Sequence, residues 1–222
     1  MKDNFVHVCF VLDESGSMSS SIDDVKGSIK NVIKEQKEEK DGTCSISLFR
    51  FGTEVTKDFV GKDINEIGEI KYEPRGMTAM NDGIGIAIDE IGKWLSDMKE
   101  EDRPSKNLIV IMTDGQENHS KEYSLSKVKE MIKHQESKYN WSFIYMGADI
   151  TSKKDSDELG IKSSVYFSKK DLGNTYNVIN SATRSLRKAA NVSEASATMD
   201  WLNCEFDALN SSYEKEKNIK LL

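Results

Sequence analysis

The chain has 222 residues and a formal net charge of −7, from 31 basic and 38 acidic residues. This length allows one large domain, with or without an appendage. The acidic balance, without a stripe of Lys and Arg interleaved with aromatic residues, argues against nucleic-acid binding. The three cysteines are widely spaced and odd in number, which favours a reducing compartment such as the cytoplasm. No apolar run reaches the roughly 18 residues of a membrane span, so no membrane association is expected.

The first part of the chain predicts a strand, a helix and a hairpin. Residues 5–12 form an apolar run that is typical of a buried strand. Residues 22–40 carry apolar side chains at the spacing of one buried helical face: Val25, Ile29, Val32 and Ile33. Two strands, 44–51 and 54–60, are separated by a Gly-Thr break, which predicts a hairpin with one antiparallel strand at an edge of the sheet.

Helix and strand patterns alternate along the middle of the chain. Residues 80–98 give the strongest helical signal, because their apolar residues recur at intervals of three and four. Residues 106–115 contain a continuous apolar run, which is typical of a strand buried on both faces of a parallel sheet. The pattern continues with a helix at 125–132, strands at 141–149 and 164–168, and a helix at 172–186. This alternation predicts an α/β fold with a doubly wound, mostly parallel sheet of about six strands and helices on both faces.

A polar segment separates these elements from a last helical pattern. Its apolar residues have the spacing of one helical face: Trp201, Leu202, Phe206, Leu209 and Tyr213. An exposed stripe of such side chains would promote aggregation, so packing onto the domain is favoured over a free partner-binding helix. We therefore predict a domain at residues 1–191 and a C-terminal helical extension at 192–222, which docks through the first four of these side chains.

Oxygen-bearing side chains follow the first predicted strand at every second position. Asp13, Ser15 and Ser17 stand on a tight turn that contains a glycine, and such a turn can aim three oxygens at one point. Open α/β sheets bind ligands at the carboxyl ends of their strands, near the point where the strand order reverses. Asp114 ends another apolar run and Thr78 precedes the longest helix, so we expect all five side chains at this edge.

These five side chains predict a metal site. Hard oxygen donors without Cys or His suit Mg²⁺ or Mn²⁺, and the carboxylates are too few for a dedicated Ca²⁺ cage. A single aspartate here could be a helix cap or a turn residue, but the joint set favours a metal. Asp82 is interpreted instead as a first-turn carboxylate favoured by the helix dipole, and Glu117 and Asn118 as solvated loop residues. The three histidines form no cluster and are expected in the core or at the surface.

The order and placement of these residues resemble a known motif. The "DESGS" at residues 13–17, the Thr of "GMTAMNDGI" and the Asp of "TDGQEN" resemble the metal-ion-dependent adhesion site (MIDAS) of von Willebrand factor type A (VWA) domains. The resemblance covers residues 5–190 and implies a Rossmann-like fold. It further implies that Ser15, Ser17 and Thr78 contact the metal, while Asp13 and Asp114 act directly or through water. The segments "RGMTA", "TDGQENHS" and "FIYMGAD" resemble intracellular bacterial and phage members.

The predicted function is a non-enzymatic, metal-dependent protein-binding module. If hydroxyl groups and water fill most of the metal shell, the cation stays under-neutralised and can take an Asp or Glu carboxylate from a partner protein. One alternative is a metal-assisted hydrolase or phosphotransferase, although the chain lacks a P-loop and a G-x-S-x-G nucleophile turn. Another is a scaffold subunit whose metal only orders the loops.

Overall fold

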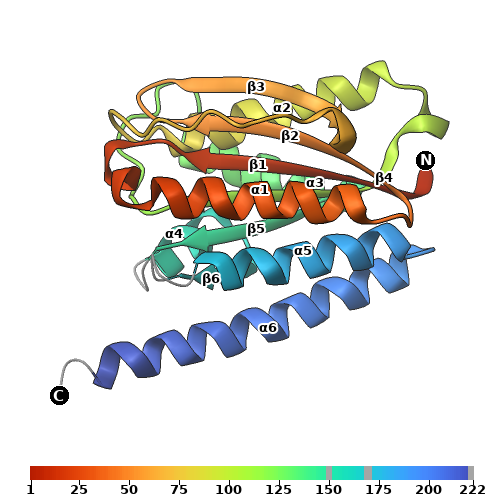
Figure 1. The fold of residues 1–222 in the computed structure, drawn as a ribbon. Coiled ribbons are helices and arrows are strands. Elements are labelled where there is room, and N and C mark those ends of the chain that lie inside the picture. Colours follow the sequence, from red (N-terminus) through yellow and green to blue (C-terminus); the bar gives the residue numbers. More distant parts are fainter. Residues whose placement is uncertain (149–151, 168–171, 220–222) are drawn as a thin grey trace.

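The computed structural model describes residues 1–148, 152–167 and 172–219 (Figure 1). The strands of the described chain are β1 (Lys2–Asp13), β2 (Thr43–Phe51), β3 (Val55–Asp63), β4 (Pro104–Thr113), β5 (Ser142–Gly147) and β6 (Ser163–Tyr166). The α-helices are α1 (Ile22–Glu38), α2 (Met80–Asp97), α3 (Leu125–Tyr139), α4 (Ser152–Leu159), α5 (Leu172–Lys188) and α6 (Val192–Ile219). Short 3₁₀ turns lie at η1 (Gly16–Ser21), η2 (Ile64–Glu66) and η3 (Glu100–Asp102).

The strands form one mixed sheet with the order β3-β2-β1-β4-β5-β6. All neighbouring strands are parallel except the β2–β3 hairpin, which puts one antiparallel strand at an edge. The predicted fold class is therefore confirmed. The chain first moves outward from β1 to β2 and β3, and later returns to the other side of β1 with β4. The strand order thus reverses between β1 and β4, which opens a crevice at their carboxyl ends.

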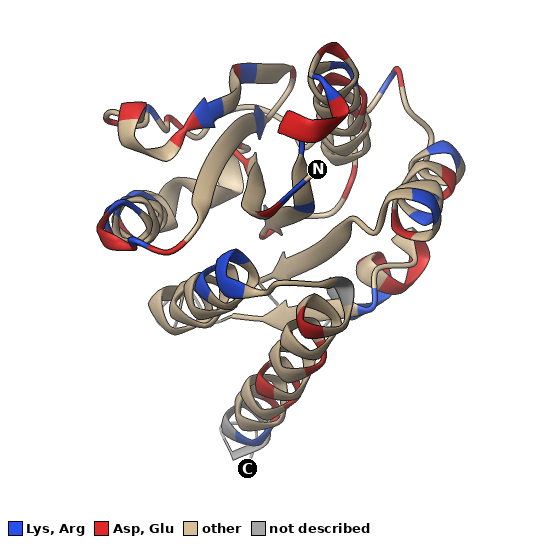
Figure 2. Cartoon of the chain, turned by 90° about the vertical axis from the view of Figure 1, so that its right-hand side faces the viewer, with Lys and Arg blue, Asp and Glu red and all other residues tan. Residues whose placement is uncertain are grey.

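Successive side chains of β1 point into two separate hydrophobic cores. Phe10 and Leu12 face the core formed with α1, α5 and α6. Cys9 and Val11 face the core formed with α2 and α3, to which α4 adds Leu159. This alternation is the two-residue period of a strand covered on both faces. Figure 2 shows the Lys, Arg, Asp and Glu residues mainly on the helices and loops around the sheet.

The predicted strands and helices up to residue 186 are present, with ends shifted by a few residues. Helix α4 was not predicted, because its sequence SKKDSDEL contributes a single buried apolar residue to the core and has no helical periodicity. The strand predicted at 141–149 ends at Gly147. Its last residue, 149, and residue 168 of the next predicted strand lie outside the described residues.

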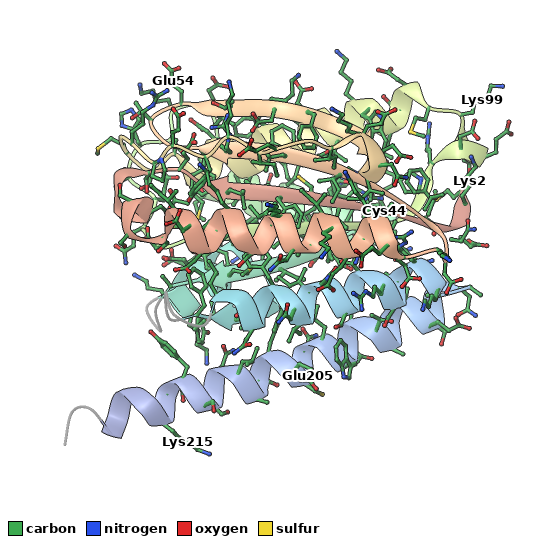
Figure 3. All side chains as sticks on the ribbon, viewed as in Figure 1. Lys2, Cys44, Glu54, Lys99, Glu205 and Lys215 are labelled. Atoms are coloured by element: carbon green, nitrogen blue, oxygen red, sulfur yellow. The ribbon has the colours of Figure 1, made fainter. Side chains whose placement is uncertain are left out.

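Helix α6 packs against α5 and β6 at one edge of the sheet. Leu202 and Phe206 are buried in the core, and Leu209 is partly buried against it. Trp201 is 42% exposed, so its predicted role in docking was wrong: adjacent helical positions differ by about 100°, and the buried face follows Leu202 and Phe206. Figure 3 shows Lys215 near the outer end of α6.

The division of the chain at residue 191 stays a prediction. None of the described helices is long and apolar enough to cross a membrane.

Lys106, near the start of β4, joins two distant parts of the backbone. The residue is 8% exposed, and its side chain reaches the start of β1. The ammonium group donates to the carbonyl of Asp3 and, at 2.6 Å, to the carbonyl of Ala189. Burial lowers the pKa of Lys106, and these carbonyls supply the acceptors that a buried cation needs.

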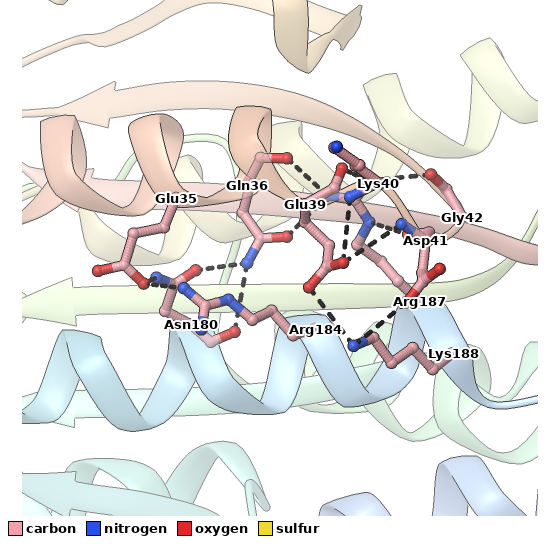
Figure 4. Close-up of polar contacts among 10 residues, drawn as sticks. All are labelled: Glu35, Gln36, Glu39, Lys40, Asp41, Gly42, Asn180, Arg184, Arg187 and Lys188. Atoms are coloured by element: carbon pink, nitrogen blue, oxygen red, sulfur yellow. Dashed lines mark hydrogen bonds and ion pairs between the residues drawn. The ribbon is translucent and has the colours of Figure 1, made fainter.

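The buried guanidinium of Arg187 joins α5 to the end of α1 (Figure 4). It donates to four backbone carbonyls at 2.7 to 3.0 Å, those of Gln36, Glu39, Asp41 and Gly42. The carbonyls of Gln36 and Glu39 stand at the end of α1, where carbonyls have no partner within the helix, and those of Asp41 and Gly42 lie in the loop that follows. Arg184, one turn earlier on α5, instead pairs with Glu35 in a half-exposed contact.

We predict that Arg187→Lys lowers the free energy of unfolding by about 3 kcal/mol, because an ammonium group cannot reach four carbonyls and each unpaired buried carbonyl costs about 1–3 kcal/mol. Arg184→Lys, the same substitution one turn away, should cost less than about 1 kcal/mol. Urea unfolding of both variants measures the difference. Equal losses would show that the carbonyl network is not the main contribution of Arg187.

Candidate metal centre

Three loops meet at the carboxyl edge of the sheet. Asp13 is the last residue of β1, Asp114 directly follows β4, and Thr78 stands two residues before α2. Leu12 pairs with Met112 in the parallel β1–β4 ladder, so the two aspartates leave the sheet at nearly the same level. Figure 3 marks this edge by Glu54, in the turn between β2 and β3, and the opposite end by Lys2 and Lys99.

A chain of short contacts links the predicted site residues. The hydroxyl of Ser17 donates to Asp114 Oδ1 at 2.5 Å and lies 3.0 Å from the hydroxyl of Ser15. The backbone N–H of Ser15 donates to Asp13 Oδ1 at 2.7 Å. Thr113 donates its hydroxyl to Asp13 Oδ2 at 2.6 Å, which fixes the other carboxylate oxygen. The "DESGS" turn after β1 and the loop after β4 are therefore connected through side chains that the sequence indicated.

Gly115 leaves a small space among the oxygens of all three loops. A Cβ atom at this position would lie 3.4 Å from Thr78 Oγ1, 3.6 Å from Ser17 Oγ and 3.9 Å from Asp13 Oδ2. Three oxygens that are far apart in sequence thus surround one point, and the absence of a side chain at Gly115 keeps that point open. Together with the contacts of Ser15 and Asp114, this geometry brings all five predicted residues together.

The site combines a buried carboxylate with a more exposed one. Asp13 is fully buried, whereas Asp114 is partly exposed. Burial raises the pKa of Asp13, the hydrogen bonds from Ser15 and Thr113 oppose this shift, and the nearby Asp114 raises the pKa further. Two carboxylates at one edge repel each other, and a cation between them would offset both the burial and the repulsion.

The donor set fits a hard divalent cation. Hydroxyls of Ser15, Ser17 and Thr78 and carboxylates of Asp13 and Asp114 could hold it, with water filling the remaining positions. In the described chain, no group of three or more His, Cys, Asp or Glu side chains is arranged to hold a metal. The site instead combines three hydroxyl groups with two carboxylates. This donor set suits Mg²⁺ better than Ca²⁺ or a soft metal.

Glu117 holds the β4–α3 loop against the first turn of α2. Its Oε2 accepts from the backbone N–H of Asn81 at 2.8 Å, and its Oε1 accepts from the N–H groups of His119 and Ser120. Asp82 makes the reciprocal link by accepting three N–H groups of the same loop at 2.8 to 3.0 Å, those of Lys121, Glu122 and Tyr123. The interpretation of Glu117 as a solvated residue was wrong. Asp82 lies in the first turn of α2, as predicted, but it also binds the backbone of the β4–α3 loop.

Asn118 fixes the position of Thr78. Its Oδ1 accepts from the N–H of Thr78 at 3.0 Å, and its own N–H donates to the carbonyl of Thr78 at 3.1 Å. Asn118 is exposed, as expected, but its amide positions a site residue. The only sequence signal for these roles was the density of capping-type residues directly after Asp114, because contacts between loops leave no periodic pattern.

The loop before α2 is also held against the "DESGS" turn. Tyr72 donates its hydroxyl to the carbonyl of Asp13 at 2.5 Å. The N–H of Arg75 donates to the carbonyl of Glu14 at 2.7 Å, and the N–H of Gly16 donates to the carbonyl of Gly76 at 3.1 Å. These three bonds fix the position of the loop that carries Thr78 relative to the "DESGS" turn. None of them was predicted.

Two polar or reactive side chains of β1 lie in the core and away from the site. His7 is fully buried, with its ring nitrogens 2.9 and 3.1 Å from the hydroxyls of Ser45 and Ser47. Burial lowers the pKa of His7 to about 3, so the ring is neutral and structural. Cys9 is also fully buried, and burial raises the pKa of its thiol.

Comparison with protein families matches residues 7–189 to the von Willebrand factor type A domain. No curated protein matches the chain. A structure of proximal thread matrix protein 1 from the mussel byssus, with a zinc-occupied MIDAS motif, is 17% identical in sequence and superposes with a TM-score of 0.59. The match covers 81% of this chain and 46% of the mussel protein. The pilus adhesin SpaC from Lactobacillus rhamnosus GG is 12% identical in sequence, with a TM-score of 0.62. That match covers 81% of this chain and 30% of SpaC.

A von Willebrand factor type A protein from Catenulispora acidiphila is 14% identical with a TM-score of 0.55, covering 81% of this chain and 42% of that chain. This chain therefore spans less than half of the length of each of the three proteins. At such identities the likeness concerns the fold.

We predict that Asp13→Asn stabilises the metal-free protein. Burial raises the folded-state pKa of Asp13, so the protonated carboxyl is favoured in the folded protein. Its contribution to stability is complete below the ordinary pKa of Asp and is lost as pH rises through the folded-state pKa. Asparagine is neutral at every pH and does not lose this contribution. The asparagine amide can donate to Thr113 Oγ1, whose hydroxyl proton can then turn to the carbonyl of Gly115, 2.9 Å away. In EDTA the melting temperature should exceed that of the unsubstituted protein by a few degrees at pH 7, and this gain should shrink towards pH 4.

Asp200→Asn, at an exposed position of α6, is the matched control and should show no such pH-dependent gain. A lower melting temperature for Asp13→Asn at pH 7 in EDTA would contradict the electrostatic account of the site.

We predict that Gly115→Ala folds normally but binds Mg²⁺ at least about tenfold more weakly, because the methyl group takes space that a coordinated water needs. Mg²⁺ at a hundredfold excess over its Kd stabilises a protein by about 2.7 kcal/mol, and a tenfold weaker affinity leaves about 1.4 kcal/mol. Thermal unfolding with and without Mg²⁺ measures both values. Gly92→Ala, where a Cβ meets nothing within 4 Å, should keep the full Mg²⁺ response. An intact response in Gly115→Ala would place the metal elsewhere.

Proposed function

We propose a function for this chain from the premise that it belongs to the von Willebrand factor type A domain family. Domains of this family typically mediate metal-dependent protein interactions. The proposed function is a non-enzymatic binding module that holds a divalent cation and uses it to capture an acidic residue of a partner protein. The observation that carries the proposal is the convergence of oxygens from three loops around the space at Gly115.

The proposed ligands are the hydroxyls of Ser15, Ser17 and Thr78, with Asp13 and Asp114 acting directly or through water. Zinc occupies the MIDAS motif of the mussel protein. In this chain the donors are all oxygens, which favours Mg²⁺, with Mn²⁺ as the second choice. When bound, the cation supplies a point of positive charge and an exchangeable coordination position.

A partner carboxylate suits that position for electrostatic reasons. Asp13 already accepts hydrogen bonds at both oxygens, and Asp114 accepts one from Ser17. These bonds partly neutralise the two carboxylates, so a bound cation keeps part of its positive charge for a further ligand. Ser17 is exposed and Asp114 is partly exposed, which leaves the solvent side of the site approachable. The chain carries a net charge of −7 and would repel an acidic ligand if no cation stood at the contact.

We further propose that the protein works in the cytoplasm of a bacterium or of a phage-infected cell. Cys9, Cys44 and Cys204 are all free, and Cys204 is exposed, which suits a reducing compartment. The bacterial or phage setting rests on the resemblance of the "RGMTA", "TDGQENHS" and "FIYMGAD" segments.

The function is tested by capture of a partner on the immobilised protein. We expect a bound protein in Mg²⁺ or Mn²⁺ that EDTA releases, and identification by mass spectrometry followed by replacement of its acidic residues should find one on which binding depends. Ser15→Ala combined with Ser17→Ala should abolish capture, because two hydroxyl ligands are lost. Ser96→Ala combined with Ser137→Ala, at exposed helical positions, is the matched control and should bind normally.

Two results would replace the proposal by its alternatives. Capture that survives both EDTA and the loss of Ser15 and Ser17 would favour a plain scaffold. Metal-dependent hydrolysis of p-nitrophenyl phosphate that stops in Asp114→Ala would favour a hydrolase, because Mg²⁺ beside a carboxylate can polarise a phosphate.

A further inference from the structure

A groove with a volume of about 630 Å³ lies between α1 and the segment that connects η2 to Tyr72. We call it the α1 groove. Its apolar lining comes from α1 and from the connecting segment: Val25, Ile29, Ile33, Ile67 and Ile70. This volume is typical of sites for small molecules, and the lining is of the kind that binds hydrocarbon.

Lysines from α1 form one rim of the α1 groove. Lys26, Lys30 and Lys34 are spaced four residues apart and Lys37 follows three residues later, so all four lie along one side of the helix. Lys37 donates to the carbonyl of Ile67 at 2.8 Å. Within the described chain the other three make no ion pair with a carboxylate. The groove lining has four lysines against two carboxylates, Glu38 and Glu69, so it carries positive charge in a chain whose net charge is −7.

Three of the isoleucines that line the α1 groove are almost covered from water. Ile29, Ile33 and Ile67 are 2%, 7% and 4% exposed, although they line a cavity. Side chains this well covered offer little surface to a helix with a diameter of about 10–12 Å, whereas a thin, unbranched hydrocarbon chain can lie between them. The shape therefore favours a small amphiphile over a helical protein partner.

We propose that the α1 groove binds a long-chain fatty acid anion. Its hydrocarbon tail lies along Ile29, Ile33 and Ile67, and its carboxylate lies between Lys26 and Lys30. Glu38 follows Lys37, and Glu69 stands two residues after Ile67, whose carbonyl binds Lys37, so both carboxylates would repel the ligand at that end of the groove. The site uses none of the proposed metal ligands, so it does not depend on the proposed function.

Isothermal titration calorimetry with sodium dodecanoate, below its micellar concentration and with EDTA present, tests the site on the full chain. We expect one saturable site. From octanoate to dodecanoate the affinity should rise by up to about fourfold for each added methylene. Undecyltrimethylammonium, which has the same alkyl tail as dodecanoate and a cationic head, should bind at least about tenfold more weakly.

Two variants locate the binding on the molecule. Lys26→Glu combined with Lys30→Glu should weaken dodecanoate binding at least about tenfold, whereas Lys129→Glu combined with Lys133→Glu, the same charge change on exposed α3, should not. Ile70→Trp fills the groove from a partly exposed position and should abolish binding while circular dichroism and the melting temperature show a folded protein.

Three results would each overturn the proposal. They are equal weakening by the two lysine pairs, unchanged binding by a folded Ile70→Trp variant, and equal affinity for the anionic and cationic amphiphiles. Binding of an acidic amphipathic peptide to the groove without any binding of dodecanoate would also show that the assigned ligand class is wrong.

Discussion

The arrangement of the metal edge depends on the burial of one carboxylate at the end of the central strand. Strand β1 lies between β2 and β4, so Asp13 leaves the sheet where neighbouring chains surround it. A charge in that position needs donors, and it receives them from the next turn through Ser15 and from β4 through Thr113. The same two bonds set the path of the "DESGS" turn and its distance from Asp114. The geometry of the site thus follows from the requirement that this carboxylate be satisfied.

The loops around Asp13 are held mainly by polar contacts with one another. Asp82 accepts three backbone N–H groups of the facing loop, Glu117 accepts one from α2 and two from its own loop, and Asn118 makes a two-way contact with Thr78. Such bonds replace the water that would otherwise surround irregular backbone, and they reduce the number of conformations open to the loops. A site that is rigid before it meets its ligand loses less entropy on binding.

Periodicity in the sequence predicted most of the fold, because the sheet is covered on both faces. The continuous apolar runs of β1 and β4 and the helical face of α2 reflect burial directly, and the strand-end location of Asp13 and Asp114 follows from them. The roles of Tyr72, Glu117 and Asp82 could not be predicted, since their partners lie in other loops and such contacts have no sequence period. Helix α4 and the exposure of Trp201 were missed for a related reason: short elements and single helical positions depend on what packs beside them.

Lys106 gives the chain a property that belongs to its architecture. One ammonium group binds the backbone at Asp3 and at Ala189, so the stretch between these residues enters and leaves the fold at a single point. A unit with adjacent entry and exit can be inserted into a surface loop of a host protein without forcing the two sides of that loop apart. The part of the fold that Lys106 closes is therefore suited to insertion at this point, whereas α6 runs from it along α5 and packs on β6.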